Sequence, residues 1–97
     1  MPRPPRLSPD DVTAALSALP LWSGGPDGIE RTVQLPTFRA AVEAVSAIAD
    51  VAELLDHHPD MDLRWTELRV AVVTHSAGGL TELDLDLARR VDALYPG

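Results

Sequence analysis

The chain has 97 residues, a formal net charge of −7 and no cysteine, and all eight of its basic residues are arginine. These facts exclude a disulfide framework, thiol catalysis, a thiolate metal site and any reaction that needs a lysine. An acidic chain without basic clusters also argues against nucleic acid and anionic membranes as partners, and no apolar run approaches the roughly 18 residues of a membrane span. We therefore expect one small domain in a reducing compartment, the cytoplasm.

The first predicted element is a short helix that follows an N-terminal arm. Residues 1–7 are rich in proline and arginine and are expected to form a flexible arm, whereas residues 8–97 form the domain. Ser8 is suited to be the N-cap of the helix, with Pro9 at its first position. Pro20 ends it.

A hairpin is predicted next. Residues 23–28 (SGGPDG) carry a turn signal, and apolar and polar residues alternate over residues 29–35. Such alternation is typical of a strand with one buried face. We expect Trp22 to belong to the first arm of this hairpin.

The longest predicted element is an amphipathic helix. Thr37 is its expected N-cap, and apolar residues recur at three- and four-residue steps from Phe38 through Val42 to Leu55. This spacing predicts a helix of roughly 18 to 20 residues. The helix must end at residues 57–59 (HHP), because the residue before a proline is disfavoured in the α conformation.

Two strands are predicted to follow this helix. Apolar residues occupy odd-numbered positions up to Trp65 and even-numbered positions from Leu68 onward. A single flat strand cannot change parity without turning its core face outward. We therefore expect a short strand, a break near residues 66–67 and a longer strand that ends near residues 74–75.

The chain ends in a third predicted helix. A loop at residues 76–79 (SAGG) precedes Thr81, which together with Asp84 forms the pattern of a capping box. The complete order is helix, two strands, helix, two strands, helix. This order predicts an α+β fold with an open four-stranded antiparallel sheet and three helices on one face.

The three histidines are the candidate chemical groups. His57 and His58 end the long helix and His75 begins the last loop, positions where catalytic groups often lie. Each has a structural alternative, since imidazoles also interact with the dipole at a helix C-terminus or satisfy a turn. A zinc site with Glu53 or Asp84 is disfavoured, because neighbouring helical residues diverge by about 100°.

The spacing of seven residues resembles the signature of the pterin-4a-carbinolamine dehydratases. The pattern is an acid, three residues, His-His-Pro, an aromatic residue six positions after the proline, a histidine ten positions later and then an aspartate. The matching residues are Glu53, His57, His58, Pro59, Trp65, His75 and Asp84. The resemblance extends over residues 16–94, although Val73 replaces a serine that is common in the family.

The resemblance implies a substrate, a site and an oligomer. The reaction is the dehydration of 4a-hydroxytetrahydropterin (4a-hydroxytetrahydrobiopterin) to quinonoid dihydropterin, which recycles the pterin cofactor of aromatic amino-acid hydroxylases. No metal or organic cofactor is implied, and a homodimer or homotetramer is expected. The implied catalytic residues are His57, His58, His75 and Asp84. The implied substrate-binding residues are Asp56, Thr74, Trp22, Pro59 and Glu53.

The roles within this site are a hypothesis. We expect His57 and His75 to exchange protons with the substrate and His58 to orient the pterin. Asp84 either fixes the tautomer of a histidine or serves only as a helix cap. The alternative function is a non-catalytic protein-binding module on the same fold, either a dimerisation cofactor or an assembly chaperone.

Overall fold

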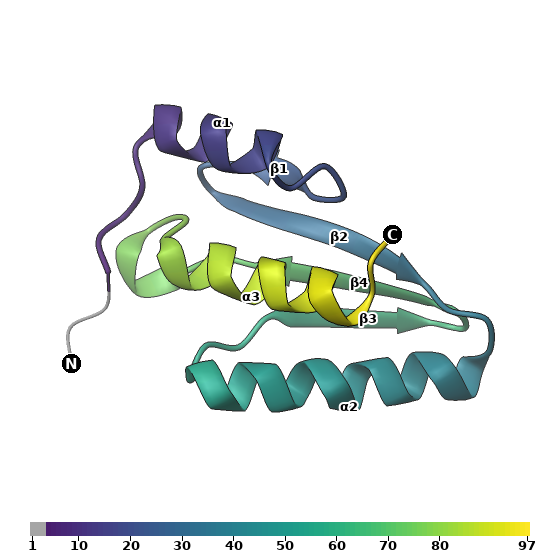
Figure 1. Ribbon diagram of the computed structural model, residues 1–97. Helices are drawn as coiled ribbons and strands as arrows, with labels where there is room; N and C mark the ends of the chain where they lie inside the picture. Colours follow the sequence, from purple (N-terminus) through teal and green to yellow (C-terminus); the bar gives the residue numbers. More distant parts are fainter. Residues whose placement is uncertain (1–3) are drawn as a thin grey trace.

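A computed structural model describes residues 4–97 and has the predicted element order. The three helices lie on one face of a four-stranded antiparallel sheet with strand order β1-β2-β4-β3, so the predicted α+β fold is confirmed (Figure 1). The elements are α1 (Pro9–Ser17), β1 (Ser23–Gly25), β2 (Gly28–Gln34), α2 (Phe38–Leu55), β3 (Asp60–Arg64), β4 (Glu67–Val72), a 3-10 helix (His75–Ala77) and α3 (Glu82–Leu94).

The helices begin where the sequence predicts. Ser8, Thr37 and Thr81 are the N-caps of α1, α2 and α3, and each accepts a hydrogen bond from a backbone amide of the first helical turn. Part of the predicted arm, residues 1–3, lies outside the described residues. Leu7, its last residue, donates a 2.8 Å backbone hydrogen bond to the carbonyl oxygen of Leu80.

The predicted break between the last two strands is a tight hairpin. Arg64 pairs with Glu67, so only Trp65 and Thr66 form the turn between β3 and β4. Trp65 adopts a positive φ of 53° and its side chain is 85% exposed. The change of parity at this turn keeps the apolar residues of both strands on the face that the helices cover.

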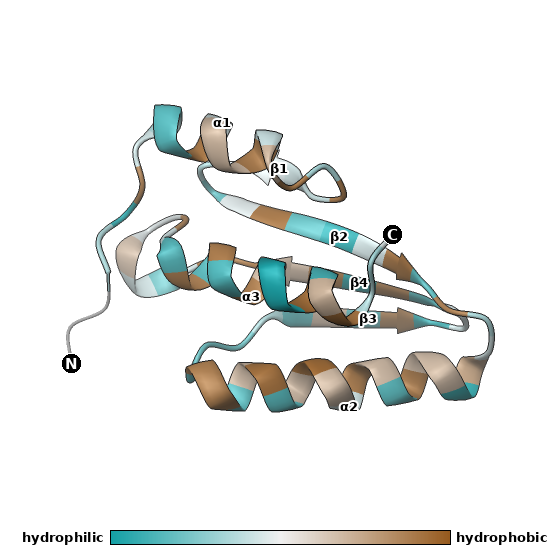
Figure 2. Cartoon of the chain, in the orientation of Figure 1, coloured by the Kyte–Doolittle hydropathy of each residue, from teal (hydrophilic) through white to brown (hydrophobic). Residues whose placement is uncertain are grey.

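The core lies between the sheet and the helices. Alternate residues of β2 and β4 are buried, whereas Glu30 and Arg69 lie on the open face of the sheet. Glu30 and Asp62 hold the pKa of the Arg69 guanidinium above its ordinary value, chiefly through the hydrogen bond from Arg69 to Glu30. Figure 2 shows the alternation of apolar and polar residues along α2. The buried apolar residues of the strands and of α2 are Ile29, Val33, Leu68, Val70, Val72, Ala41, Ala44, Ile48 and Ala52.

Two details of the predictions are wrong. Residues 23–25, predicted as part of a turn, form β1, and only residues 26–27 turn the chain, because Gly24 adopts a φ of 132° that lets its backbone pair with β2. Phe38 and Val42, predicted in the apolar stripe of α2, are 56% and 43% exposed. The buried arc of α2 is centred on its alanines, and Val42 lies about 100° around the helix from Ala41.

Candidate active site

The antiparallel pairing of β3 and β4 brings the histidines together. Asp60, at the start of β3, pairs with Ala71 near the end of β4, so the segment before β3 lies beside the segment after β4. His57 and His58 precede β3, and His75 follows β4. The C-terminus of α2 and the N-terminus of α3 meet at this same end of the sheet (Figure 1, left). The predicted convergence of the three imidazoles therefore has a topological cause.

A left-handed turn at the end of α2 separates the directions of the two adjacent histidines. Asp56 adopts φ 49° and ψ 44°, and the backbone amide of His57 donates a 3.0 Å hydrogen bond to the carbonyl oxygen of Ala52. This is the hydrogen-bond pattern of a Schellman motif. As a result the His57 side chain is only 7% exposed, whereas that of His58 is 59% exposed.

Asp84 is the centre of a buried hydrogen-bond network. Its Oδ1 atom lies 2.6 Å from Nε2 of His57, and its Oδ2 atom accepts 2.8 Å hydrogen bonds from the Thr74 hydroxyl and the Thr81 backbone amide. The carboxylate is completely buried, and no buried side-chain polar atom in residues 4–97 lacks a partner. Asp84 is therefore both the predicted helix cap and the partner of a histidine.

The other two histidines are open to solvent. The Nε2 atom of His58 lies 3.0 Å from Oε2 of the exposed Glu53, and His75 begins the 3-10 helix with an exposed side chain. Together with His57 they line a shallow pocket of about 290 Å³. The pocket is lined by Asp56, His57, His58, Val73, Thr74, His75 and Ser76.

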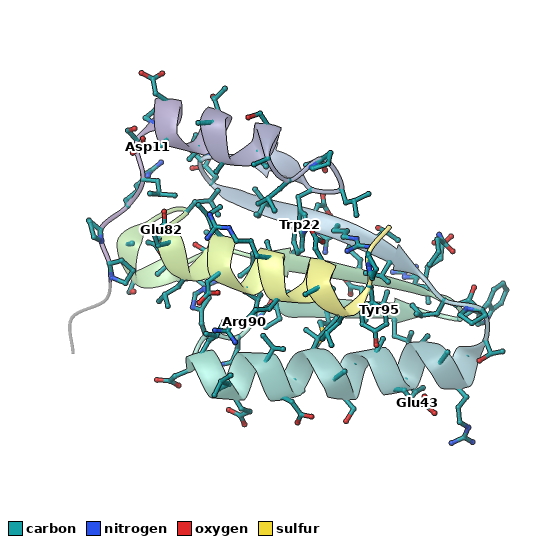
Figure 3. All side chains as sticks on the ribbon, in the orientation of Figure 1. Asp11, Trp22, Glu43, Glu82, Arg90 and Tyr95 are labelled. Carbon is teal, nitrogen blue, oxygen red and sulfur yellow. The ribbon has the colours of Figure 1, made fainter. Side chains whose placement is uncertain are left out.

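Three of the residues expected to bind substrate do not line this pocket. Trp22 is 5% exposed, and its indole nitrogen donates a 2.9 Å hydrogen bond to Asp92. Figure 3 shows Trp22 in the layer between α1 and α3. Pro59 is half-buried beside His58, and Glu53 contributes through its hydrogen bond to His58. Thr74 does line the pocket, and its buried hydroxyl donates a hydrogen bond to Asp84.

Thr81, which the sequence predicts only as a helix cap, belongs to the same buried hydrogen-bond network. Its side chain is fully buried, and its hydroxyl lies 2.9 Å from that of Thr74. The capping-box pattern close after a histidine was the available signal. A larger cavity of about 650 Å³ lies beside Arg31 and Tyr95, but no histidine lines it.

Two further findings concern the described part of the chain. Within residues 4–97, no three histidine, aspartate or glutamate side chains are grouped so that they could hold a metal ion. The same residues contain no helix with the length and apolar character that crossing a membrane requires.

The sequence profile of the family described as pterin 4 alpha carbinolamine dehydratase matches residues 5–94. The chain belongs to this family. A Nocardia farcinica relative, provisionally named pterin-4-alpha-carbinolamine dehydratase, is 48% identical over 88 residues, which are 91% of this chain and 93% of the relative. An Acidobacterium capsulatum protein with the same provisional name is 47% identical over 89 residues, or 92% of this chain and 97% of its own length.

Two solved structures resemble this chain. The crystal structure of a "transcriptional coactivator/pterin dehydratase" from Brucella melitensis has a TM-score of 0.87 at 35% identity, covering 93% of this chain and 98% of that one. A pterin dehydratase-like protein identified as a RuBisCO assembly factor in the alpha-carboxysome has a TM-score of 0.63 at 22% identity, covering 75% and 84%. The second likeness shows a shared fold.

Proposed function

We propose that this protein is a hydro-lyase that converts 4a-hydroxytetrahydropterin, such as 4a-hydroxytetrahydrobiopterin, into quinonoid dihydropterin. The observation that carries the proposal is the pocket in which His57, His58 and His75 meet, with Asp84 buried behind His57. Membership of the dehydratase family supports this choice of substrate class. The proposed role is the recycling, in the cytoplasm, of the pterin cofactor used by aromatic amino-acid hydroxylases.

The reaction needs two proton movements. The hydroxyl group at C4a receives a proton and leaves as water, and a proton leaves the ring nitrogen as the C=N bond forms. General acid–base catalysis of such steps contributes about 10²- to 10⁴-fold, and imidazole is suited to it near neutral pH. In our proposal His57 and His75 exchange these protons, and the exposed His58, paired with Glu53, orients the pterin.

The buried carboxylate supports the role of His57. Because Asp84 already accepts hydrogen bonds from Thr74 and Thr81 at Oδ2, its Oδ1 atom is directed at Nε2 of His57. An ionised carboxylate only accepts hydrogen bonds, so the imidazole donates its Nε2–H. This arrangement fixes one tautomer of His57.

The test is a direct assay of dehydration. The carbinolamine is generated by a pterin-dependent hydroxylase, and the formation of quinonoid dihydropterin is followed with and without this protein. We expect acceleration by the wild type and a loss of about 10²-fold or more in the variants His57→Ala and His75→Ala. An undiminished rate in both variants, or no acceleration by the wild type, would overturn the proposal.

A protein-binding function is the second candidate. Trp65 and Phe38 are 85% and 56% exposed and line a groove of about 670 Å³ at the turn between β3 and β4. The Brucella melitensis relative is described as a transcriptional coactivator as well as a pterin dehydratase. A stoichiometric protein partner, combined with no dehydratase activity, would favour this function.

Self-association into a homodimer or homotetramer is proposed with either function, because α2 exposes apolar side chains that a second copy could bury.

A further inference from the structure

The hydrogen bonds behind His57 continue beyond Asp84. The Thr74 hydroxyl donates a 2.8 Å hydrogen bond to Oδ2 of Asp84 and lies 2.9 Å from the Thr81 hydroxyl. The Thr81 hydroxyl in turn accepts a 3.2 Å hydrogen bond from the backbone amide of Leu83. Asp84 and Thr81 are fully buried, and Thr74 is 3% exposed. These groups come from the segment that follows β4 and from the start of α3.

The hydrogen bonds among Thr81, Thr74 and Asp84 all run in one direction. A hydroxyl group has one proton, and Thr74 uses it on Asp84, so Thr74 must accept at its contact with Thr81. The Thr81 hydroxyl therefore donates to Thr74. Each hydroxyl in this series donates toward Asp84. The carboxylate thus receives hydrogen bonds of the kind that an ionised carboxylate accepts. His57 completes the set at Oδ1.

Helix capping explains only part of this arrangement. The capping box accounts for Thr81 and for the bond from its backbone amide to Asp84. It does not account for Thr74, which belongs to another segment, nor for complete burial of the hydroxyl pair. An apolar valine of the same shape would fill the space of Thr74 without the need to satisfy a buried hydroxyl.

We infer that Thr74 and Thr81 are positioning residues for the dehydration: their hydroxyls orient the Asp84 carboxylate, which holds His57 as the Nε2–H tautomer. Neither residue touches the reacting atoms in this inference. Its kinetic part rests on the proposed function, whereas the tautomer of His57 can be measured without any substrate. As a consequence, two threonines on the far side of the buried carboxylate determine the tautomer of His57.

The experiment compares Thr74→Val with Thr74→Ser, and Thr81→Ser serves as a variant that keeps both the hydroxyl and the cap. Nitrogen-15 spectra report the tautomer of each imidazole, and the variants His58→Gln and His75→Gln assign the three signals. We expect the Nε2–H form of His57 in the wild type and in both serine variants. Thr74→Val should show a mixture of tautomers and a kcat lowered about 10-fold with KM within about twofold. Thermal unfolding selects the variants that are folded.

The outcomes separate this inference from the proposed function. A folded Thr74→Val protein that keeps both the wild-type tautomer and the wild-type kcat would overturn the inference. If Thr74→Val does not fold, a Thr81→Ser protein with an altered His57 tautomer despite its retained hydroxyl would overturn it as well. If the wild type shows no dehydration, the proposed function fails, and the nitrogen-15 signals alone decide the role of the threonines.

Discussion

The Nε2 atom of His57 lies 2.6 Å from Oδ1 of the completely buried Asp84, although 27 residues separate the two in the chain. By contrast, the side chains of His58 and Glu53 expose more than half of their surface to solvent. The pocket thus combines one buried imidazole, which is hydrogen-bonded to Asp84, with two solvent-exposed imidazoles. This difference underlies the first two predictions.

Replacing Asp84 by asparagine should reverse the hydrogen bond to His57. The amide oxygen is needed to accept from Thr74 and Thr81, so the amide NH2 group must face the imidazole, which then accepts at Nε2. We expect kcat to fall about 10²-fold and the Nδ1–H tautomer to dominate the nitrogen-15 spectrum. Asp86→Asn, a more exposed site on the same helix, is the control and should change neither quantity.

Removing the charge of Glu53 should affect binding more than chemistry. Glu53→Gln keeps the shape of the side chain but weakens the hold on His58, so we expect KM to rise about threefold with kcat unchanged. The pair is exposed, and the free energy of unfolding should change by less than about 0.5 kcal/mol. Steady-state kinetics beside Glu43→Gln on the same helix is the check. A kcat that falls as much as it does in His57→Ala would contradict the assigned role of His58.

Asp56 should affect both the backbone at the end of α2 and the binding of substrate. Its left-handed conformation costs about 1 kcal/mol relative to glycine. Asp56→Gly relieves this backbone cost, and it should raise KM, because a carboxylate that lines the pocket is lost. Urea unfolding and steady-state kinetics measure the two effects. Asp56→Asn tolerates the same backbone and should raise KM with little change in stability; an unchanged KM in both variants would exclude Asp56 from binding.

The ion pair near Trp22 should be structural. Arg31 is 6% exposed, and its Nη1 atom lies 2.5 Å from Oδ1 of Asp92. The same oxygen also accepts a hydrogen bond from the Trp22 indole. Asp92→Ala leaves a buried guanidinium without its partner and should lower the free energy of unfolding by about 3 kcal/mol. The double variant Arg31→Met/Asp92→Leu removes both charges and should recover part of this loss. Urea unfolding decides, and a double variant less stable than Asp92→Ala would contradict the expectation.

Self-association should depend on the exposed apolar face of α2. Light scattering at micromolar concentration is expected to give a mass that is a multiple of the 10.4 kDa chain. The double variant Phe38→Ser/Val42→Ser should shift the mass toward the monomer, because it removes two of the large exposed apolar side chains. Leu54→Ser, an exposed change near the other end of the helix, shows whether the effect is specific to that end. A wild-type protein that is strictly monomeric would contradict the proposal.

The sequence alone determined the elements and their order. Helix caps, proline stops and apolar periodicity act within a few residues of the chain, so Ser8, Thr37 and Thr81 predicted the three helix starts. The parity change near Trp65 predicted the β3–β4 turn for the same reason. The spacing of the histidines and acids also indicated the dehydratase family.

Only the tertiary structure decided how exposed these residues are and which groups they contact. Adjacent in the chain, His57 and His58 have opposite exposures because the left-handed turn at Asp56 directs one of them at α3. Trp22 bonds to Asp92 across 70 residues and lies outside the pocket where it was expected. Such contacts depend on how helices pack against the sheet, and local propensity and spacing carry no information about that packing.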